Sequence, residues 1–192
     1  GERRFESDGI ARNDEQEACI RVVEDCPPPG VKYRDMTGIL EDPDQSEQMF
    51  AGLVAKATAF SGDAIVCIES RGFLLGSVVA QHISVPLILA RKAGKLAFPT
   101  YSSGSYELEY GKDSLEIQKN SALHSAQKVI LLDDVIASGG TALACCKLLS
   151  ENFGIPCQSI LVLTFIELAY LDGAEVIRTN GYNFETIVSL KA

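Results

Sequence analysis

Four runs of mostly apolar residues divide the chain. Each is followed by a polar turn and then by a segment in which apolar residues recur at another spacing or not regularly. Unbroken apolar runs of this length are typical of parallel strands buried on both faces. The runs are 64–68, 85–90, 129–132 and 159–166. Apolar residues at helical spacing fill the intervals 44–60, 73–81 and 142–149. This alternation predicts an α/β fold with a doubly wound, mostly parallel sheet flanked by helices.

The N-terminal part predicts a helix and a short extended segment. Asn13 or Asp14 can cap a helix whose apolar residues extend to Cys26, where Pro27, Pro28, Pro29 and Gly30 end it. Residues 31–35 then form a short extended stretch that, taken alone, is typical of an edge strand. We expect residues 1–12 to be disordered and residues 13–192 to form one domain.

Two later segments have less regular patterns. Residues 95–111 are rich in Gly, Ser, Tyr and Pro and have no helical period, which inside a compact domain is typical of a functional flap. Residues 105–110 and 115–118 alternate like the two arms of a hairpin. The tail, 177–190, predicts one or two strands that turn at 181–183.

Composition excludes some classes of function. Lys and Arg number 17 against 26 Asp and Glu, a formal charge of −9, which argues against a sequence-independent nucleic-acid surface. No apolar run reaches the ~20 residues that span a bilayer, and we expect no membrane partner. Six cysteines without a Cys-x-x-Cys pair are typical of a reducing, cytoplasmic location.

The turn after the third apolar run has the chemistry of a phosphate cradle. Gly139 and Gly140 let a ligand approach the backbone, and the first N–H groups of the next helix favour an anion. Ser138 and Thr141 add hydroxyl donors. The preceding carboxylates, Asp133 and Asp134, repel phosphate and suit sugar hydroxyls or a hydrated cation. A phosphate beside a vicinal diol describes a ribose 5-phosphate, whereas a capped helix with solvating acids is the structural alternative.

Two other strands end in cationic residues. Arg71 follows the first apolar run and Arg91 the second, with Lys95 close behind. The guanidinium fork suits phosphate oxygens. Because the carboxyl ends of parallel strands share one edge of a sheet, the sequence predicts a common anion pocket there.

Several segments resemble the type I phosphoribosyltransferase family. Residues 131–141 (LLDDVIASGGT) are similar to the family's motif for phosphoribosyl diphosphate (PRPP). Further matches, in family order, resemble the members that act on adenine. They are 29–35, 69–76, 91–96 and 108–118. The chain departs from the usual pattern at Ala93, where a second arginine is common.

The resemblance implies transfer of the 5-phosphoribosyl group from PRPP to adenine, giving AMP and pyrophosphate in purine salvage. It implies Mg²⁺ carried on PRPP without direct protein ligands, a homodimer, and a hood formed by residues 13–40 with the flexible loop 95–111. Glu109 would be the catalytic general base. PRPP would contact Arg71, Arg91, Lys95, Tyr110, Asp133, Asp134, Ala137, Ser138, Gly139, Gly140 and Thr141. Adenine would contact Lys32, Tyr33, Arg34 and Leu168.

Two alternatives stay open at this stage. A regulator of the same fold would bind PRPP and nucleic acid, with a basic face and no catalytic carboxylate. An enzyme of the same family could instead accept another 6-aminopurine or a hypoxanthine-type base.

Overall fold

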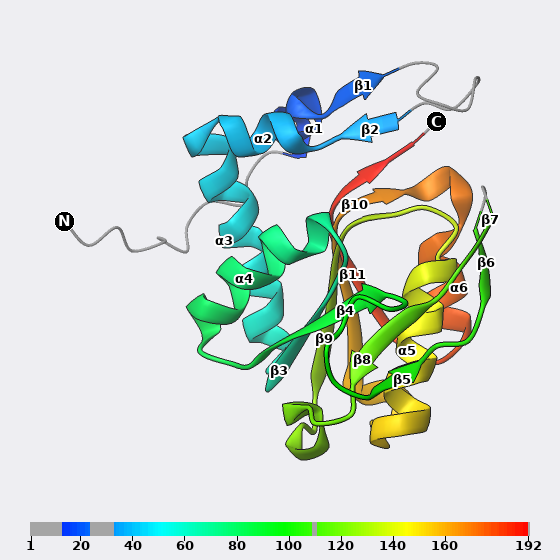
Figure 1. The fold of residues 1–192 in the computed structure, drawn as a ribbon. Coiled ribbons are helices and arrows are strands. Elements are labelled where there is room, and N and C mark those ends of the chain that lie inside the picture. Colours follow the sequence, from blue (N-terminus) through cyan, green and yellow to red (C-terminus); the bar gives the residue numbers. More distant parts are fainter. Residues whose placement is uncertain (1–12, 24–32, 109–110, 192) are drawn as a thin grey trace.

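A seven-stranded sheet forms the centre of the computed structural model, which describes residues 13–23, 33–108 and 111–191 (Figure 1). Its strand order is β11-β10-β9-β3-β4-β8-β5. The first five are parallel, whereas β8 is antiparallel to both β4 and β5. The strands are β3 (Ala64–Ile68), β4 (Leu87–Lys92), β5 (Thr100–Ser102), β8 (Leu115–Gln118), β9 (Val129–Ile136), β10 (Ile160–Leu168) and β11 (Asn183–Leu190). The predicted fold class is confirmed.

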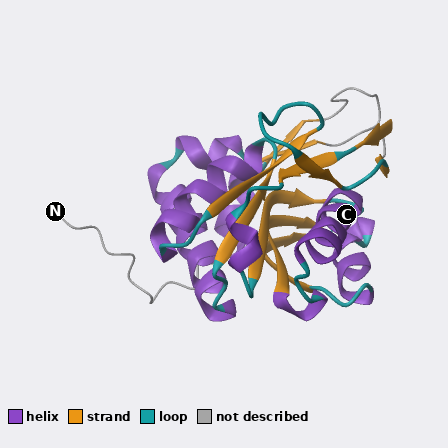
Figure 2. Cartoon of the chain, turned by 60° about the horizontal axis from the view of Figure 1, so that its bottom comes forward, coloured by secondary structure: helices purple, strands orange, loops and turns teal. Residues whose placement is uncertain are grey.

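Helices cover both faces of this sheet, as Figure 2 shows. On one face lie α3 (Pro43–Phe60) and α4 (Arg71–Ile83), and on the other α5 (Gly140–Phe153) and α6 (Gly173–Thr179). Each face has its own core: Ile65 packs with α3 and α4, while Val66 packs with α5 and α6. The buried strands therefore read as continuous apolar runs.

The N-terminal part differs from the predicted helix. Helix α1 (Asn13–Cys19) ends early, and β1 (Arg21–Val23) pairs antiparallel with β2 (Tyr33–Asp35), followed by α2 (Thr37–Glu41). Val22 and Val23, 46% and 44% exposed, have helical spacing but no core to pack against. Backbone pairing with β2, which suits β-branched residues, decides their conformation.

The predicted hairpin of residues 105–110 with 115–118 is wrong. Strand β6 (Tyr106–Leu108) pairs with β7 (Gly111–Asp113), whereas β8 joins the main sheet. Leu115 and Ile117 are only 1% and 0% exposed, so the alternation in this segment serves the core of the domain.

The tail is also corrected. Ile177, expected in a strand, lies in α6, where it is fully buried together with Gly173 and Ala174 on one side of the helix. Only the last segment forms a strand, β11. Three short 3₁₀ helices complete the described chain: Ala122–Ser125, Cys157–Ser159 and Ala169–Leu171. No helix among the described residues is long and apolar enough to cross a membrane.

Candidate active site

The carboxyl ends of β3, β4, β9 and β10 lie at one edge of the sheet and carry most of the candidate residues. Asp133 and Asp134 belong to β9 itself, since this strand continues to Ile136 instead of ending at Leu132. In a strand, consecutive side chains point to opposite faces. The two side chains therefore start from opposite faces of the strand, although both residues line the same cavity.

The predicted cradle is a cavity of about 200 Å³ between β9 and the first turn of α5. Its walls comprise Asp133, the turn 135–142 and Thr164 of β10. Gly139, the N-terminal cap of α5, has φ 85°, and a Cβ there would lie 2.9 Å from the carbonyl oxygen of Gly173. The glycine is thus required by backbone conformation and by packing against the start of α6, and not only by ligand approach.

A second cavity, of about 460 Å³, adjoins the cradle and shares Asp133, Val135 and Thr141 with it. Four carboxylates and three cations line it: Glu69, Asp113, Asp133, Asp134, Arg71, Lys92 and Lys95. The structure therefore brings the acidic pair of β9 together with Arg71 and Lys95 in one continuous site. Lys92, which was not predicted, lines this cavity in place of Arg91.

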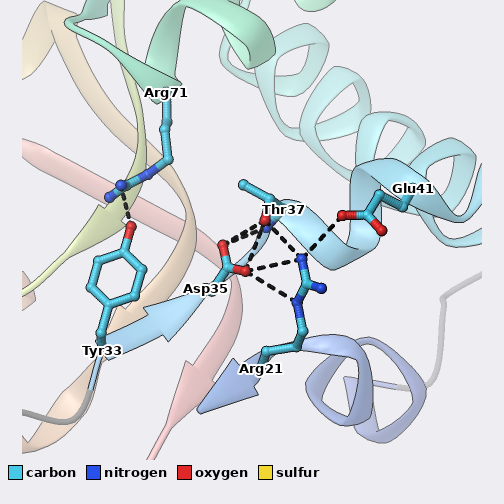
Figure 3. Close-up of polar contacts among 6 residues, drawn as sticks. All are labelled: Arg21, Tyr33, Asp35, Thr37, Glu41 and Arg71. Carbon is cyan, nitrogen blue, oxygen red and sulfur yellow. Dashed lines mark hydrogen bonds and ion pairs between the residues drawn. The ribbon is translucent and has the colours of Figure 1, made fainter. Parts of the chain in front are cut away.

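Arg71, in the first turn of α4, forms an ion pair with Asp134 through Nε. Its Nη1 donates a hydrogen bond to the hydroxyl of Tyr33 (Figure 3). Burial alone would lower the pKa of Arg71, but the Asp134 carboxylate outweighs it and raises the pKa. The guanidinium thus connects a predicted adenine residue with a predicted ribose residue.

Asp133 is the other half of the acidic pair. Removal from water and the neighbouring Asp134 carboxylate raise its pKa well above the usual value of 3.8. Its Oδ1 accepts a hydrogen bond from the Asp134 N–H at 2.9 Å. A sugar hydroxyl suits such a group, because a neutral or an ionised carboxyl can bond to it.

Sequence reasoning assigned no role to Glu69, which organises the cations of β4. Its Oε1 accepts a hydrogen bond from Lys95 Nζ at 2.6 Å, and its Oε2 accepts from Arg91 Nε at 3.3 Å and from the Lys92 N–H at 2.9 Å. The peptide bond between Glu69 and Ser70 is cis. The one available signal was its position at the end of a buried strand.

Three of the four predicted adenine-binding residues lie in the described part of the chain. Tyr33 and Arg34 lie on β2, and Arg34 Nε is buried without a hydrogen-bond partner among the described residues. Leu168, 8% exposed, ends β10. Lys32, together with Glu109 and Tyr110, lies outside the described residues.

A polar network holds β2 in place beside the site (Figure 3). Arg21 of β1 bonds to Asp35 at 3.1 Å, to Thr37 at 2.9 Å and to Glu41 at 3.1 Å. Burial alone would raise the pKa of Asp35. Hydrogen bonds from the N–H and the hydroxyl of Thr37, together with Arg21, outweigh burial and lower the pKa. This network joins three elements, β1, β2 and α2, and no pattern in the sequence predicted it.

Within the described ranges, no three His, Cys, Asp or Glu residues lie close enough together to hold a metal ion. Asp133, Asp134 and Glu69 nevertheless face a common cavity, and carboxylates there suit the water shell of a hard cation such as Mg²⁺. The residues present therefore fit a cation that arrives with its own ligands.

Comparisons with known proteins agree on one family. The family model described as "Phosphoribosyl transferase domain" matches residues 37–166. The chain is 43% identical to the adenine phosphoribosyltransferase of Rattus norvegicus over 159 residues, which covers 81% of this chain and 86% of the rat protein.

Two solved structures are similar over almost the whole chain. The adenine phosphoribosyltransferase of Thermoanaerobacter pseudethanolicus has a TM-score of 0.83 and 34% identity, covering 93% of this chain and 100% of that one. The APRTase of Giardia lamblia, complexed with 9-deazaadenine, has a TM-score of 0.84 and 28% identity, covering 94% and 99%.

Proposed function

The chain belongs to the phosphoribosyltransferase family and to its adenine phosphoribosyltransferase branch, and from that premise we propose how its residues carry the reaction. It is an enzyme that transfers the 5-phosphoribosyl group of PRPP to adenine and yields AMP and pyrophosphate, a step of purine salvage. The residue roles below are the proposal.

One observation carries the assignment of roles: the cradle and the cation-lined cavity share Asp133, Val135 and Thr141. PRPP is a ribose with a monophosphate at one end and a pyrophosphate at the other. The cradle suits the 5-phosphate, which the backbone of 137–141 and the start of α5 would bind. The larger cavity suits the ribose hydroxyls and the pyrophosphate.

Charge determines what each residue does in the transfer. The anomeric carbon gains positive charge as pyrophosphate leaves, so both charges need stabilisation in the transition state. Asp133 and Asp134 hold the ribose hydroxyls beside that carbon. Arg71, with Arg91 and Lys95, binds the departing pyrophosphate.

Adenine would lie between Tyr33 and Leu168, with the backbone of Lys32 and the side chain of Arg34 at its edge. Support comes from Tyr33, whose hydroxyl is bonded to Arg71, so that the base and the pyrophosphate site are adjacent. Adenine loses a ring proton as it attacks. Glu109 accepts that proton as general base, delivered with Tyr110 by the loop 95–111.

Mg²⁺ is part of the proposal as a cofactor bound to PRPP. It would supply charge neutralisation on the pyrophosphate. Asp133 and Asp134 would contact it through water, since no set of three protein ligands is present among the described residues.

We also propose a homodimer. On α4, Leu74 and Val78 are 51% and 37% exposed, and on β4, Leu87 and Leu89 are 37% and 38% exposed. Leu87 lies next to Gly76, on the α4 side of the sheet, and we infer that these side chains form one apolar surface. A second copy that covers it would bury the largest exposed aliphatic groups of this part of the chain. Light scattering of an active preparation tests this, and a monomer at micromolar concentration would contradict it.

The remaining proposals concern extent and location. We propose that residues 13–192 form a single domain, because strands from 64 to 190 share one sheet. A cytoplasmic location fits the five described cysteines, all of which are free thiols: Cys19, Cys67, Cys145, Cys146 and Cys157.

The decisive experiment measures AMP formation from adenine and PRPP with Mg²⁺, using hypoxanthine and guanine as competing bases. We expect turnover with adenine alone. Turnover with hypoxanthine would redefine the base, whereas PRPP binding without turnover on any base would favour the regulator.

A further inference from the structure

Glu69 is nearly buried at the carboxyl end of β3, with a side chain 9% exposed. Its carboxylate contacts two cations of the β4 side, Lys95 at 2.6 Å and Arg91 at 3.3 Å, whereas the Lys92 ammonium pairs with Asp113. Burial alone would raise the pKa of Glu69, but the bonds from Lys95, the Lys92 N–H and Arg91 outweigh it and lower the pKa to about 2. Glu69 is therefore an anion throughout the neutral range.

These contacts occupy the groups that pyrophosphate needs. Lys95 Nζ and Arg91 Nε point at a carboxylate of their own chain, and Arg71 likewise points at Asp134. A pyrophosphate that enters must replace carboxylate oxygens by phosphate oxygens at the same donors. Two anions that share one set of donors compete, since each loses charge-assisted hydrogen bonds when the other gains them.

We propose that Glu69 is a positioning residue that holds Arg91 and Lys95 in the empty site and competes with pyrophosphate for them, so that it sets the rate of pyrophosphate release. This inference rests on the proposed function for its ligand. The Glu69 carboxylate keeps Arg91 and Lys95 ordered when no ligand is bound, and it weakens the binding of pyrophosphate because it occupies the same donors.

Two effects of opposite sign follow from removing the charge, and their balance decides the experiment. In Glu69→Gln, one amide oxygen still accepts from Lys95 or from the Lys92 N–H, so part of the ordering remains. The competing charge is lost entirely. Competition therefore dominates, and pyrophosphate should bind about tenfold more tightly, which is the lower end of the effect of one hydrogen bond to a charged group.

The control is Asp113→Asn. Asp113 lines the same cavity and forms an ion pair with Lys92 at 3.1 Å, yet it contacts neither Arg91 nor Lys95. Asp113→Asn changes the charge of the cavity by the same amount as Glu69→Gln. A similar gain in both variants would mean that net charge alone acts and would overturn the proposal.

The experiment measures the affinity of Mg²⁺-pyrophosphate for the whole chain by calorimetry and its inhibition against PRPP. We expect Glu69→Gln to bind pyrophosphate about tenfold more tightly, with a lower KM for PRPP, an unchanged KM for adenine and a lower kcat. Weaker or unchanged pyrophosphate binding would overturn the proposal.

Two further measurements separate the possible failures. Thermal unfolding shows whether the variant is folded, and if it is not, Glu69→Asp tests the same competition: a shorter carboxylate that reaches Lys95 less well should also tighten pyrophosphate binding, and unchanged binding would overturn the proposal. Calorimetry needs no turnover, so a wild-type chain that binds pyrophosphate but makes no AMP contradicts the proposed function and leaves the Glu69 measurement valid.

Discussion

The phosphate cradle and the cation side of the site adjoin at Asp133, Val135 and Thr141, yet they are built in different ways. The cradle comes almost entirely from one stretch, 133–142, and offers backbone groups. The cation side gathers residues from the end of β3, the start of α4, β4 and the segment after it, and offers side-chain charges held by carboxylates. We propose that backbone geometry controls the binding of one half of PRPP and that charge balance controls the binding of the other.

The largest effect should come from Gly139→Val. A side chain at φ 85° is strained, and its Cβ would meet Gly173 at 2.9 Å, so the turn must move and PRPP binding should be lost in calorimetry. Gly154→Val is the matched control, because Gly154 caps the other end of α5 at φ 69° with nothing within 4 Å of its Cβ. It should lower stability and leave PRPP affinity intact. Equal affinity in both variants would refute the backbone account of the cradle.

Glu109→Gln separates chemistry from binding. If Glu109 is the general base, kcat should fall by about 10²–10⁴-fold because the proton acceptor is lost. Substrate Kd values should change little, since neither half of the PRPP site is altered. Glu107→Gln, two residues away, should be nearly silent in the same steady-state assay. Small, equal effects of the two substitutions would remove Glu109 from the mechanism.

Asp133→Asn combined with Asp134→Asn acts where the two halves meet. The amides keep the volume of the side chains but lose the charged acceptors for the ribose hydroxyls, and we expect kcat/KM to fall about 100-fold. Asp63→Asn is the control: Asp63 accepts hydrogen bonds from the N–H groups of Gln127 and Lys128 at the opposite edge of the sheet. Asp63→Asn should lower the free energy of unfolding and leave kcat/KM unchanged. Near-normal kcat/KM in the double variant would contradict the ribose assignment.

The smallest effect concerns acid stability of the cation side. The pKa of Glu69 is about 2 in the folded chain against a usual 4.5, so its ion pairs stabilise the fold above pH about 4.5 and lose this contribution as the pH falls towards 2. The free energy of unfolding of Glu69→Gln should therefore approach that of the wild type in acid. Urea unfolding at pH 7 and pH 3 measures this.

Glu185→Gln is its control, because Glu185 pairs with Lys56 at 2.6 Å but is 51% exposed. Exposed pairs contribute little, so this variant should differ little from the wild type at either pH. A wild-type advantage over Glu69→Gln that persists undiminished at pH 3 would contradict the sign of the shift.

Local pattern was sufficient for the central sheet, and it predicted a phosphate cradle at a turn where the structure has a cavity. The apolar runs at 64–68 and 129–132 became β3 and the first half of β9, because strands buried on both faces leave no room for polar residues. The Ser-Gly-Gly turn could be recognised from the sequence because its polar and glycine residues are consecutive. Pattern failed where an apolar residue had several possible partners: Val22 and Val23 pair with β2, and Ile177 lies in α6.

The sequence by itself thus determined the fold class and the succession of strands and helices through the central part of the chain, and it predicted an anion-binding turn at 137–141. Only the tertiary structure decided that Glu69 holds Lys95, 26 residues away, and that Asp134 holds Arg71, 63 residues away. Any of the chain's 26 acidic residues could pair with any of its 17 basic ones. Charge attraction has no sequence register, so the choice of partner falls to the packing of β3, α4, β4 and β9 that brings these groups within a few ångströms.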